Sequence, residues 1–151
     1  MARAPINVHV IPFRKSNGLL EYAILKRSDM GVWQGIAGGG EDDETPLDAA
    51  KRESFEECCI PQEATYVKLD AVTSIPVSYF AGDFDWGDDV YVIPQYAFGV
   101  DAAPYEIRLS SEHTEIKWIP YEQAYELLHF HNNKHDLWEL NQRLKGKGPR
   151  G

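Results

Sequence analysis

One helix is delimited clearly in this sequence, and β-rich segments lie on both sides of it. Thr45 suits the N-cap and Pro46 the first helical position. Asp48 is at the third helical position, where a carboxylate can accept a hydrogen bond from the N-cap backbone. We predict a helix from Pro46 to about Cys58, which Pro61 ends. Because the order is strands, helix, strands and helices, the sequence predicts an α/β fold with a mixed β-sheet sandwiched between helices.

The other predicted elements are short periodic segments separated by turn residues. Alternating or β-branched residues predict strands at 6–13, 20–25, 64–80, 89–100 and 115–120. Helical periodicity appears at 122–128 and 135–144. Residues 26–44 are dense in glycine and acids and are predicted to be a long loop, with at most a short strand near 33–36. A loop of this length in a compact domain is usually functional.

Length and composition favour one globular domain over residues 1–151, with 145–151 as a flexible tail. The chain has 151 residues, of which 43% are hydrophobic, so it can bury a core of its own. No segment resembles a signal peptide or a membrane span, and a cytoplasmic protein is expected. The net charge of -9 argues against a nucleic-acid polymer as partner. The only cysteines are the neighbours Cys58 and Cys59, so a disulfide is not expected.

Three glutamates of the predicted helix converge on one face. Glu53, Glu56 and Glu57 stand at i, i+3 and i+4, and three carboxylates this close repel one another unless a cation offsets them. Arg52 can pair with Glu56, four residues on. A hard divalent ion would offset the charge better, and carboxylate oxygens suit Mg²⁺ or Mn²⁺. Taken alone, the cluster is more typical of a solvated helix face in an acidic protein than of a metal site.

The wider pattern resembles the Nudix box, G-x5-E-x7-R-E-U-x-E-E-x-G-U, where U is a bulky aliphatic residue. Gly38 and Glu44 precede the segment "RESFEECCI", which runs from Arg52 to Ile60 with the spacing of the pattern. Two positions depart from it. Ser54 replaces an aliphatic residue, and Cys59 replaces the glycine that would give a left-handed helix end, so that this turn must close differently or with strain.

The resemblance implies a Nudix fold and a metal-dependent hydrolase. Nudix hydrolases cleave a nucleoside diphosphate linked to another moiety by attack of water on phosphorus. By this pattern Glu53, Glu56 and Glu57 would bind Mg²⁺, with Mn²⁺ as an alternative, and one of them or a later carboxylate would activate the water. Arg52 and Glu44 would orient the glutamates. The glycines that begin at Gly38 would let the backbone approach the metal and the phosphates.

Two further segments resemble the bacterial dihydroneopterin triphosphate pyrophosphatase and dATP pyrophosphohydrolase branch of the family. They are "LKRSDMGVWQGIAGG" before the helix and "LSSEHTEIKWIP" after it. In that branch a turn glutamate joins the metal cluster, which here would be Glu112; the expected catalytic residues are Arg52, Glu53, Glu56 and Glu112. The expected substrate contacts are Lys26, Arg27, Trp33, Gln34, Gly38 and Gly39. A solvated strand end for the two basic residues, and a bracing role for the tryptophan, stay open.

The implied reaction is Mg²⁺-dependent hydrolysis of a nucleoside triphosphate or a pterin triphosphate to the monophosphate and pyrophosphate. The partner would be a small phosphorylated molecule, and a homodimer is left open. Pro76 and Tyr79 are single-residue markers of an ADP-ribose pyrophosphatase and of a dinucleoside polyphosphate hydrolase, respectively. A noncatalytic nucleotide-sensing module is a further alternative, although such modules usually lose box glutamates.

Two other groups of residues carry weaker expectations. The histidines at 113, 129, 131 and 135 have no zinc-type partners in the sequence and are expected at the surface or at a pocket rim. The acidic segment 83–89 is expected to form a mobile loop over the substrate.

Overall fold

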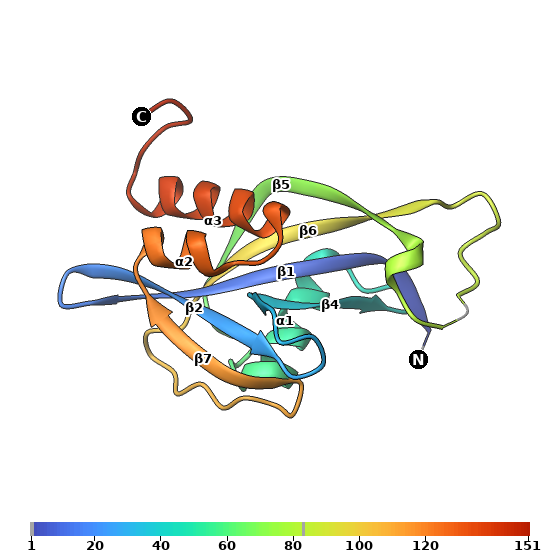
Figure 1. Ribbon diagram of the computed structural model, residues 1–151, viewed down its shortest axis with the longest axis horizontal. Coiled ribbons are helices and arrows are strands. Elements are labelled where there is room, and N and C mark those ends of the chain that lie inside the picture. Colours follow the sequence, from blue (N-terminus) through green and yellow to red (C-terminus); the bar gives the residue numbers. More distant parts are fainter. Residues whose placement is uncertain (1, 83) are drawn as a thin grey trace.

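The computed structural model describes residues 2–82 and 84–151, which form a β-sheet with helices on both of its faces (Figure 1). The strands are β1 (Arg3–Ser16), β2 (Leu19–Arg27), β3 (Trp33–Gln34), β4 (Ile36–Glu41), β5 (Tyr66–Pro76), β6 (Val92–Asp101) and β7 (His113–Ile119). The helices are α1 (Pro46–Cys58), α2 (Tyr121–Leu127), α3 (His131–Leu144) and the short 3-10 helix η1 (Val77–Tyr79).

The sheet is mixed and is organised around the long strand β1. Its first part pairs antiparallel with β4, its last part pairs antiparallel with β2, and β6 lies parallel to it on the other side. The main order is β3-β2-β1-β6-β5, with β7 added beside β2. This arrangement confirms the predicted mixed sheet sandwiched between helices.

A hydrophobic core lies on each face of the sheet. Val8 and Leu25 pack with Ala50 of α1 on one face, whereas Ile11 packs with Leu137 of α3 on the other. Successive residues of a strand point to opposite faces, so β1 contributes to both cores. Apolar side chains therefore fix the position of α1 on one side of β1 and of α3 on the other.

Helix α1 begins and ends as the sequence indicates. The Thr45 side chain accepts a hydrogen bond from the Asp48 backbone, and the Asp48 side chain accepts one from the Thr45 backbone. Cys59 adopts the left-handed conformation, with φ 59° and ψ 26°, so the turn keeps the geometry that glycine usually gives and bears some strain. Cys58 is buried, Cys59 is exposed, and both are free thiols.

The predicted loop over residues 26–44 is wrong for residues 36–41, which form strand β4. Three glycines in succession favour a loop because glycine weakens a strand. In the structure, side chains of neighbouring elements occupy the space where the three Cβ atoms would lie: Glu53 at Gly38, Arg3 at Gly39 and Ile6 at Gly40. The glycines therefore allow a strand to form in a crowded place.

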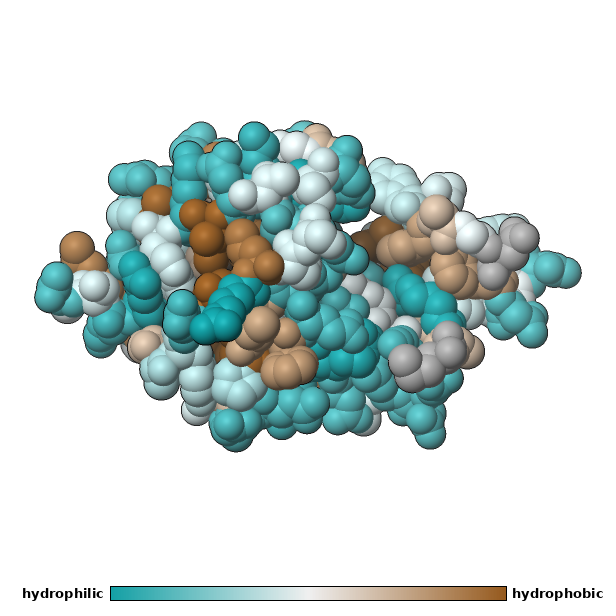
Figure 2. Space-filling view, turned by 90° about the horizontal axis from the view of Figure 1, so that it is seen from below, coloured by the Kyte–Doolittle hydropathy of each residue, from teal (hydrophilic) through white to brown (hydrophobic). Residues whose placement is uncertain are grey.

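The face of the molecule below the sheet is mostly hydrophilic (Figure 2). Figure 2 shows the molecule from below, with hydrophobic side chains gathered in only a few places. Residues 145–151 follow α3 and are exposed. Among the helices of residues 2–82 and 84–151, none combines the length and the hydropathy that crossing a membrane would require.

Candidate active site

Arg52 of α1 lies at the centre of a network of carboxylates. Its guanidinium donates two hydrogen bonds to Glu44, of 2.9 and 3.1 Å. It also donates to Glu53 at 3.0 Å and to Glu56 at 3.1 Å. A last bond, of 2.6 Å, goes to the carbonyl of Gly39 in β4. Hydrogen bonding from Arg52 lowers the pKa of Glu44. One arginine thus fixes three glutamates and ties them to the glycine strand.

The Glu53 carboxylate lies directly against β4. A Cβ atom at Gly38 would stand 2.2 Å from its Cδ and 2.5 Å from each of its oxygens. Burial raises the pKa of Glu53 to about 7; Arg52 opposes the rise, and the carboxylates of Glu56 and Glu112 add to it. A carboxylate in this position is crowded by negative charge, which a cation would offset.

The turn before β7 brings Glu112 to the same helix. Glu57 of α1 is only 5% exposed, and its carboxylate accepts a hydrogen bond from the Ser110 hydroxyl. The pKa of Glu112 is raised to about 7, first by its hydrogen bond with Glu57 and then by burial. Glu57 and Glu112, 55 residues apart in the chain, are therefore neighbours.

The prediction that the histidines lie at the surface or at a pocket rim is wrong for His113. It is 7% exposed because it starts β7 beside α1, and its Nδ1 lies 3.9 Å from a Glu57 oxygen. Burial lowers the pKa of this imidazole.

The carboxylates suit a hard divalent ion in their chemistry. Glu53, Glu56, Glu57 and Glu112 offer only oxygen atoms, as Mg²⁺ and Mn²⁺ prefer. The pKa of Glu53 is raised chiefly by burial and that of Glu112 chiefly by its hydrogen bond with Glu57, and neighbouring carboxylates add to both shifts. In the part of the chain that the structure describes, no three acidic, histidine or cysteine side chains gather closely enough to hold an ion. Hydrogen bonds to Arg52 and Ser110 hold the carboxylates instead.

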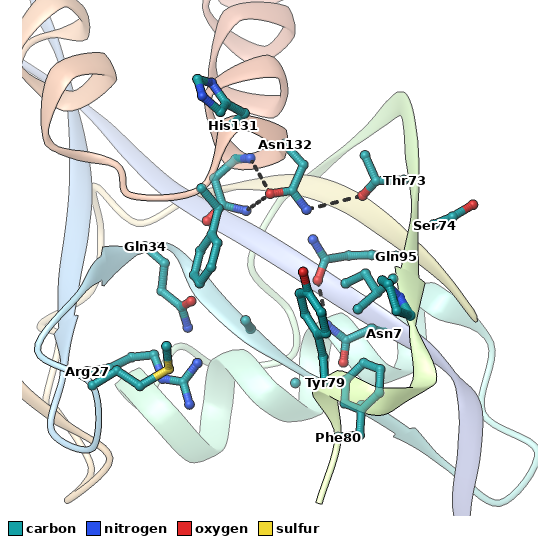
Figure 3. Close-up of a pocket in the computed structure, with 18 of the residues that line it drawn as sticks. Asn7, Arg27, Gln34, Thr73, Ser74, Tyr79, Phe80, Gln95, His131 and Asn132 are labelled. Atoms are coloured by element: carbon teal, nitrogen blue, oxygen red, sulfur yellow. Dashed lines mark hydrogen bonds between the residues drawn. The ribbon is translucent and has the colours of Figure 1, made fainter. Parts of the chain in front are cut away.

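A cavity of about 890 Å³ borders Gly38, the residue against which the Glu53 carboxylate lies. Its wall comes from the starts of β1, β4 and α3, from the ends of β2 and β5, and from β3, β6 and η1. In Figure 3, Arg27 and Gln34 lie on one side of the cavity, and Asn7, Tyr79 and Gln95 lie on the other. Gly38 belongs both to this wall and to the contact with Glu53, so the cavity and Glu53 share one residue of β4.

The structure places the predicted substrate contacts in two groups. Arg27, Gln34, Gly38 and Gly39 line the cavity. Lys26 and Trp33 do not line it, because neighbours in a strand point to opposite faces. Trp33 packs against the core beneath α2 and α3, which agrees with the bracing role left open for it.

Arg3 was not predicted as a site residue, yet its guanidinium lines the cavity between Gly39 and an aromatic cluster. Its Cζ lies 5.1 Å from the centre of the Phe80 ring and 5.7 Å from that of Trp86. The indole of Trp86 donates a 2.8 Å hydrogen bond to the Arg3 carbonyl, and Phe84 stacks on Trp86. The described residues of the acidic segment 84–89 are not in the cavity wall; Asp83 lies outside the described residues.

Buried carboxamides of the cavity wall were missed as well. Asn7 donates a 2.5 Å hydrogen bond to Gln95, and these residues are 6% and 5% exposed. Their signal in the sequence was a polar residue inside each of two apolar strand segments, at a position where a core side chain would be expected. Phe130 and Asn132 complete the wall near α3.

Comparison with known proteins identifies the family. The family model of the NUDIX domain matches residues 4–140. A comparison with curated proteins finds no match. Among solved structures, a protein from Listeria monocytogenes assigned as a NUDIX hydrolase is 39% identical, with a TM-score of 0.86; the match covers 96% of this chain and 99% of that one. The chain therefore belongs to the Nudix family, as an enzyme of the pyrophosphohydrolase class.

More distant structures share the fold. The E. coli dihydroneopterin triphosphate pyrophosphohydrolase is 21% identical, with a TM-score of 0.72, over 93% of this chain and 99% of that one. A C. elegans Ap4A hydrolase is 22% identical, with a TM-score of 0.69, over 93% of this chain and 98% of that one. The resemblance to the Nudix family and its fold is thus confirmed, and the narrower branch stays a prediction.

Proposed function

We propose that the protein hydrolyses a pyrophosphate bond in a nucleoside triphosphate or a pterin triphosphate, with Mg²⁺, and releases the monophosphate and pyrophosphate. One observation carries this proposal. Gly38 lines the cavity and also touches the Glu53 carboxylate. A ring held in the cavity would therefore direct its phosphates toward the glutamates of α1.

The charges of the cavity wall favour a phosphorylated substrate. Arg3 and Arg27 line it, and none of the described residues of the wall is an aspartate or a glutamate. Arginine donors match phosphate oxygens well. Arg27 is paired with Asp29, whereas Arg3 bonds to uncharged oxygens of Ala4, Ile6 and Asn7. In a chain with a net charge of -9, Arg3 would therefore provide the attraction for an anion that the overall charge opposes.

We assign the roles of the carboxylates from their positions on α1 and in the turn before β7. Glu53, Glu56, Glu57 and Glu112 would hold Mg²⁺, or Mn²⁺, which would neutralise the developing charge of the phosphates. Arg52 and Glu44 would keep the glutamates oriented through the bonds described above. The residue that takes the proton of the attacking water would be one of these glutamates, and Glu112 is a candidate because it approaches the cluster from a separate turn.

The aromatic part of the cavity wall suits a neutral heteroaromatic ring. Tyr79, Phe80 and Phe130 supply aromatic surface on which a base or a pterin could stack. Carboxamides beside them can both donate to and accept from the polar edge of such a ring. This combination favours a ring with several hydrogen-bonding groups over a simple sugar phosphate.

A second candidate is hydrolysis of a dinucleoside polyphosphate. Tyr79, the marker residue for that activity, lines the cavity and is 74% exposed, so it could contact a second nucleoside. Pro76, the corresponding marker for ADP-ribose, lines the cavity too.

A substrate panel tests these alternatives. The protein would be incubated with dATP, dihydroneopterin triphosphate, Ap4A and ADP-ribose, with Mg²⁺ and with a chelator, and pyrophosphate and phosphate would be assayed separately. We expect Mg²⁺-dependent pyrophosphate release from one of the two triphosphates. Turnover of Ap4A alone would favour the second candidate, and a folded protein inactive on the whole panel would overturn the proposal.

A further inference from the structure

His9 of β1 is buried completely, between the sheet and α3. Its Nδ1 lies 2.8 Å from Oδ2 of Asp136, a residue of α3 that is 3% exposed. Its Nε2 lies 3.0 Å from the backbone nitrogen of Gly35. Both ring nitrogens thus have a protein partner, and the imidazole bridges a helix and the segment between β3 and β4.

The partners determine where the proton of this imidazole resides. A backbone N–H can only donate, so Nε2 must be the acceptor of the bond from Gly35. Nδ1 then carries the proton and donates a hydrogen bond to the Asp136 carboxylate. In histidine sites of this kind, the hydrogen bond at one nitrogen fixes the tautomer. Position 35 does not accommodate a side chain, because a Cβ atom there would lie 2.6 Å from Nε2 of His9.

The two ends of this bridge belong to two walls of the cavity. Gly35 follows Gln34, which lines one wall. Asp136 lies about one helical turn beyond Asn132 and Asn133, which line another. The bridge therefore sets the separation of the two walls from behind, without entering the cavity itself.

Gln34 needs such support because its own side chain is not held by the protein. It is 6% exposed and lines the open cavity, and its carboxamide takes part in none of the side-chain hydrogen bonds among residues 2–82 and 84–151. Figure 3 shows the carboxamide directed into the cavity. A buried amide directed into a cavity without a protein partner is suited to a polar group of a ligand.

We propose that His9 and Asp136 are positioning residues for Gln34, which reads the polar edge of the heteroaromatic ring of the substrate. This inference rests on the proposed function for the identity of the ligand. His9 would not contact the substrate. It would hold the Gly35 backbone in place, and through that backbone it would position the Gln34 carboxamide.

Two substitutions of His9 separate its two bonds. Asparagine can place an N–H near the position of Nδ1 and keeps the bond to Asp136, but it cannot reach Gly35. Glutamine can place an oxygen near the position of Nε2 and keeps an acceptor for Gly35. We expect His9→Asn to raise KM for the preferred triphosphate about tenfold, the worth of one lost hydrogen bond, with kcat little changed. His9→Gln should recover most of that loss.

A double-mutant cycle with Gln34→Ala tests whether His9 acts through Gln34. If it does, the variant that carries both His9→Asn and Gln34→Ala should have the KM of Gln34→Ala alone. Additive effects would overturn the proposal. Asp136→Ala serves as a second route to the same cycle if His9→Asn does not fold.

Tyr22→Phe is the matched control for a general loss of stability. Its hydroxyl donates a buried 2.7 Å hydrogen bond to Asn141 of α3, and neither residue lines the cavity. The control should lose stability as His9→Asn does and keep the wild-type KM. Equal rises of KM in Tyr22→Phe and His9→Asn would overturn the proposal.

A measurement without substrate keeps this inference separate from the proposed function. In the ligand-free protein, ¹⁵N NMR should show His9 protonated at Nδ1 only, and the side-chain amide signals of Gln34 should shift in His9→Asn but not in Tyr22→Phe. Unmoved Gln34 signals in His9→Asn would overturn the positioning role, whatever the enzyme hydrolyses. A wild-type protein with these signals but with no turnover would overturn the proposed function alone.

Discussion

The contact between Gly38 and Glu53 allows a sharp test of the glutamate site, the substitution Gly38→Ala. The new Cβ would lie 2.2 Å from Cδ of Glu53, whereas carbon atoms in contact stand about 3.5 Å apart or more. The carboxylate would have to retreat by more than ~1 Å. Gly38 is not among the residues with positive φ, so alanine is compatible with its backbone and the fold should survive.

The expected effect of Gly38→Ala is a loss of activity larger than the loss of stability. A displacement of about 1 Å at a reacting centre can cost about 100-fold in rate, or about 2.7 kcal/mol of transition-state stabilisation. We therefore expect kcat/KM for pyrophosphate release to fall about 100-fold. Thermal unfolding followed by circular dichroism should show a much smaller change.

Gly40→Ala is the matched control, two residues further along the same strand. Its Cβ would meet the aliphatic Ile6 side chain, 2.6 Å from Cγ1, and would cost roughly 1–3 kcal/mol of stability as an overpacked contact. It should keep most of the activity because it does not touch Glu53. Wild-type activity in Gly38→Ala, or an equal loss in both variants, would refute the assignment of Glu53 to the reaction.

Three further predictions concern α1 and its end. Glu57→Gln keeps the shape of a side chain that is 5% exposed but removes its charge, so Mg²⁺-dependent turnover should fall by roughly 100-fold or more with the fold intact; an unchanged rate would contradict the proposed metal site. Cys59→Gly should relieve the left-handed strain of Cys59 and stabilise the protein by roughly 0.5–1 kcal/mol; a lowered unfolding temperature would contradict this. Burial raises the pKa of the Cys58 thiol to about 12 and Cys59 is exposed, so a thiol reagent should label one cysteine in the native protein and both after unfolding; two fast-reacting thiols in the native protein would show that Cys58 is accessible.

The sequence predicted the parts of the fold that local chemistry determines. The start of α1 is fixed by side chains within four residues of one another, Thr45 to Asp48, and their reciprocal bonds are present. The convergence of Glu53, Glu56 and Glu57 depends only on helical geometry. The family pattern then added Glu44, nine residues before Glu53, and Glu112, 55 residues after Glu57; both lie near the triad in the structure.

The parts that the sequence did not reveal depend on contacts between distant segments. The glycine-rich sequence of β4 predicts a loop, and only the packing of Arg3 and Glu53 against its glycines explains why glycines are needed in this strand. The place of Arg3 in the cavity wall depends on Phe80 and Trp86, some eighty residues away in the chain. Periodicity describes one segment at a time, so it carried no information about which segments meet at the cavity.

The buried polar residues Asn7 and His9 of β1 contribute to the cavity, one in its wall and one behind it. Asn7 and His9 alternate with Val8 and Val10 in β1, so the strand gives its apolar side to the core under α1 and places polar side chains on its other side. A buried polar group is costly unless it is bonded, and both residues are bonded: Asn7 to Gln95 across the sheet, and His9 to Gly35 and α3. Such groups in a strand are therefore evidence of a constraint that a hydrophobic side chain could not meet. Here Asn7 forms part of the wall that would face the ring, and His9 holds from behind the segment that carries Gln34, so the specificity of the cavity would be built into the same strand that carries the core.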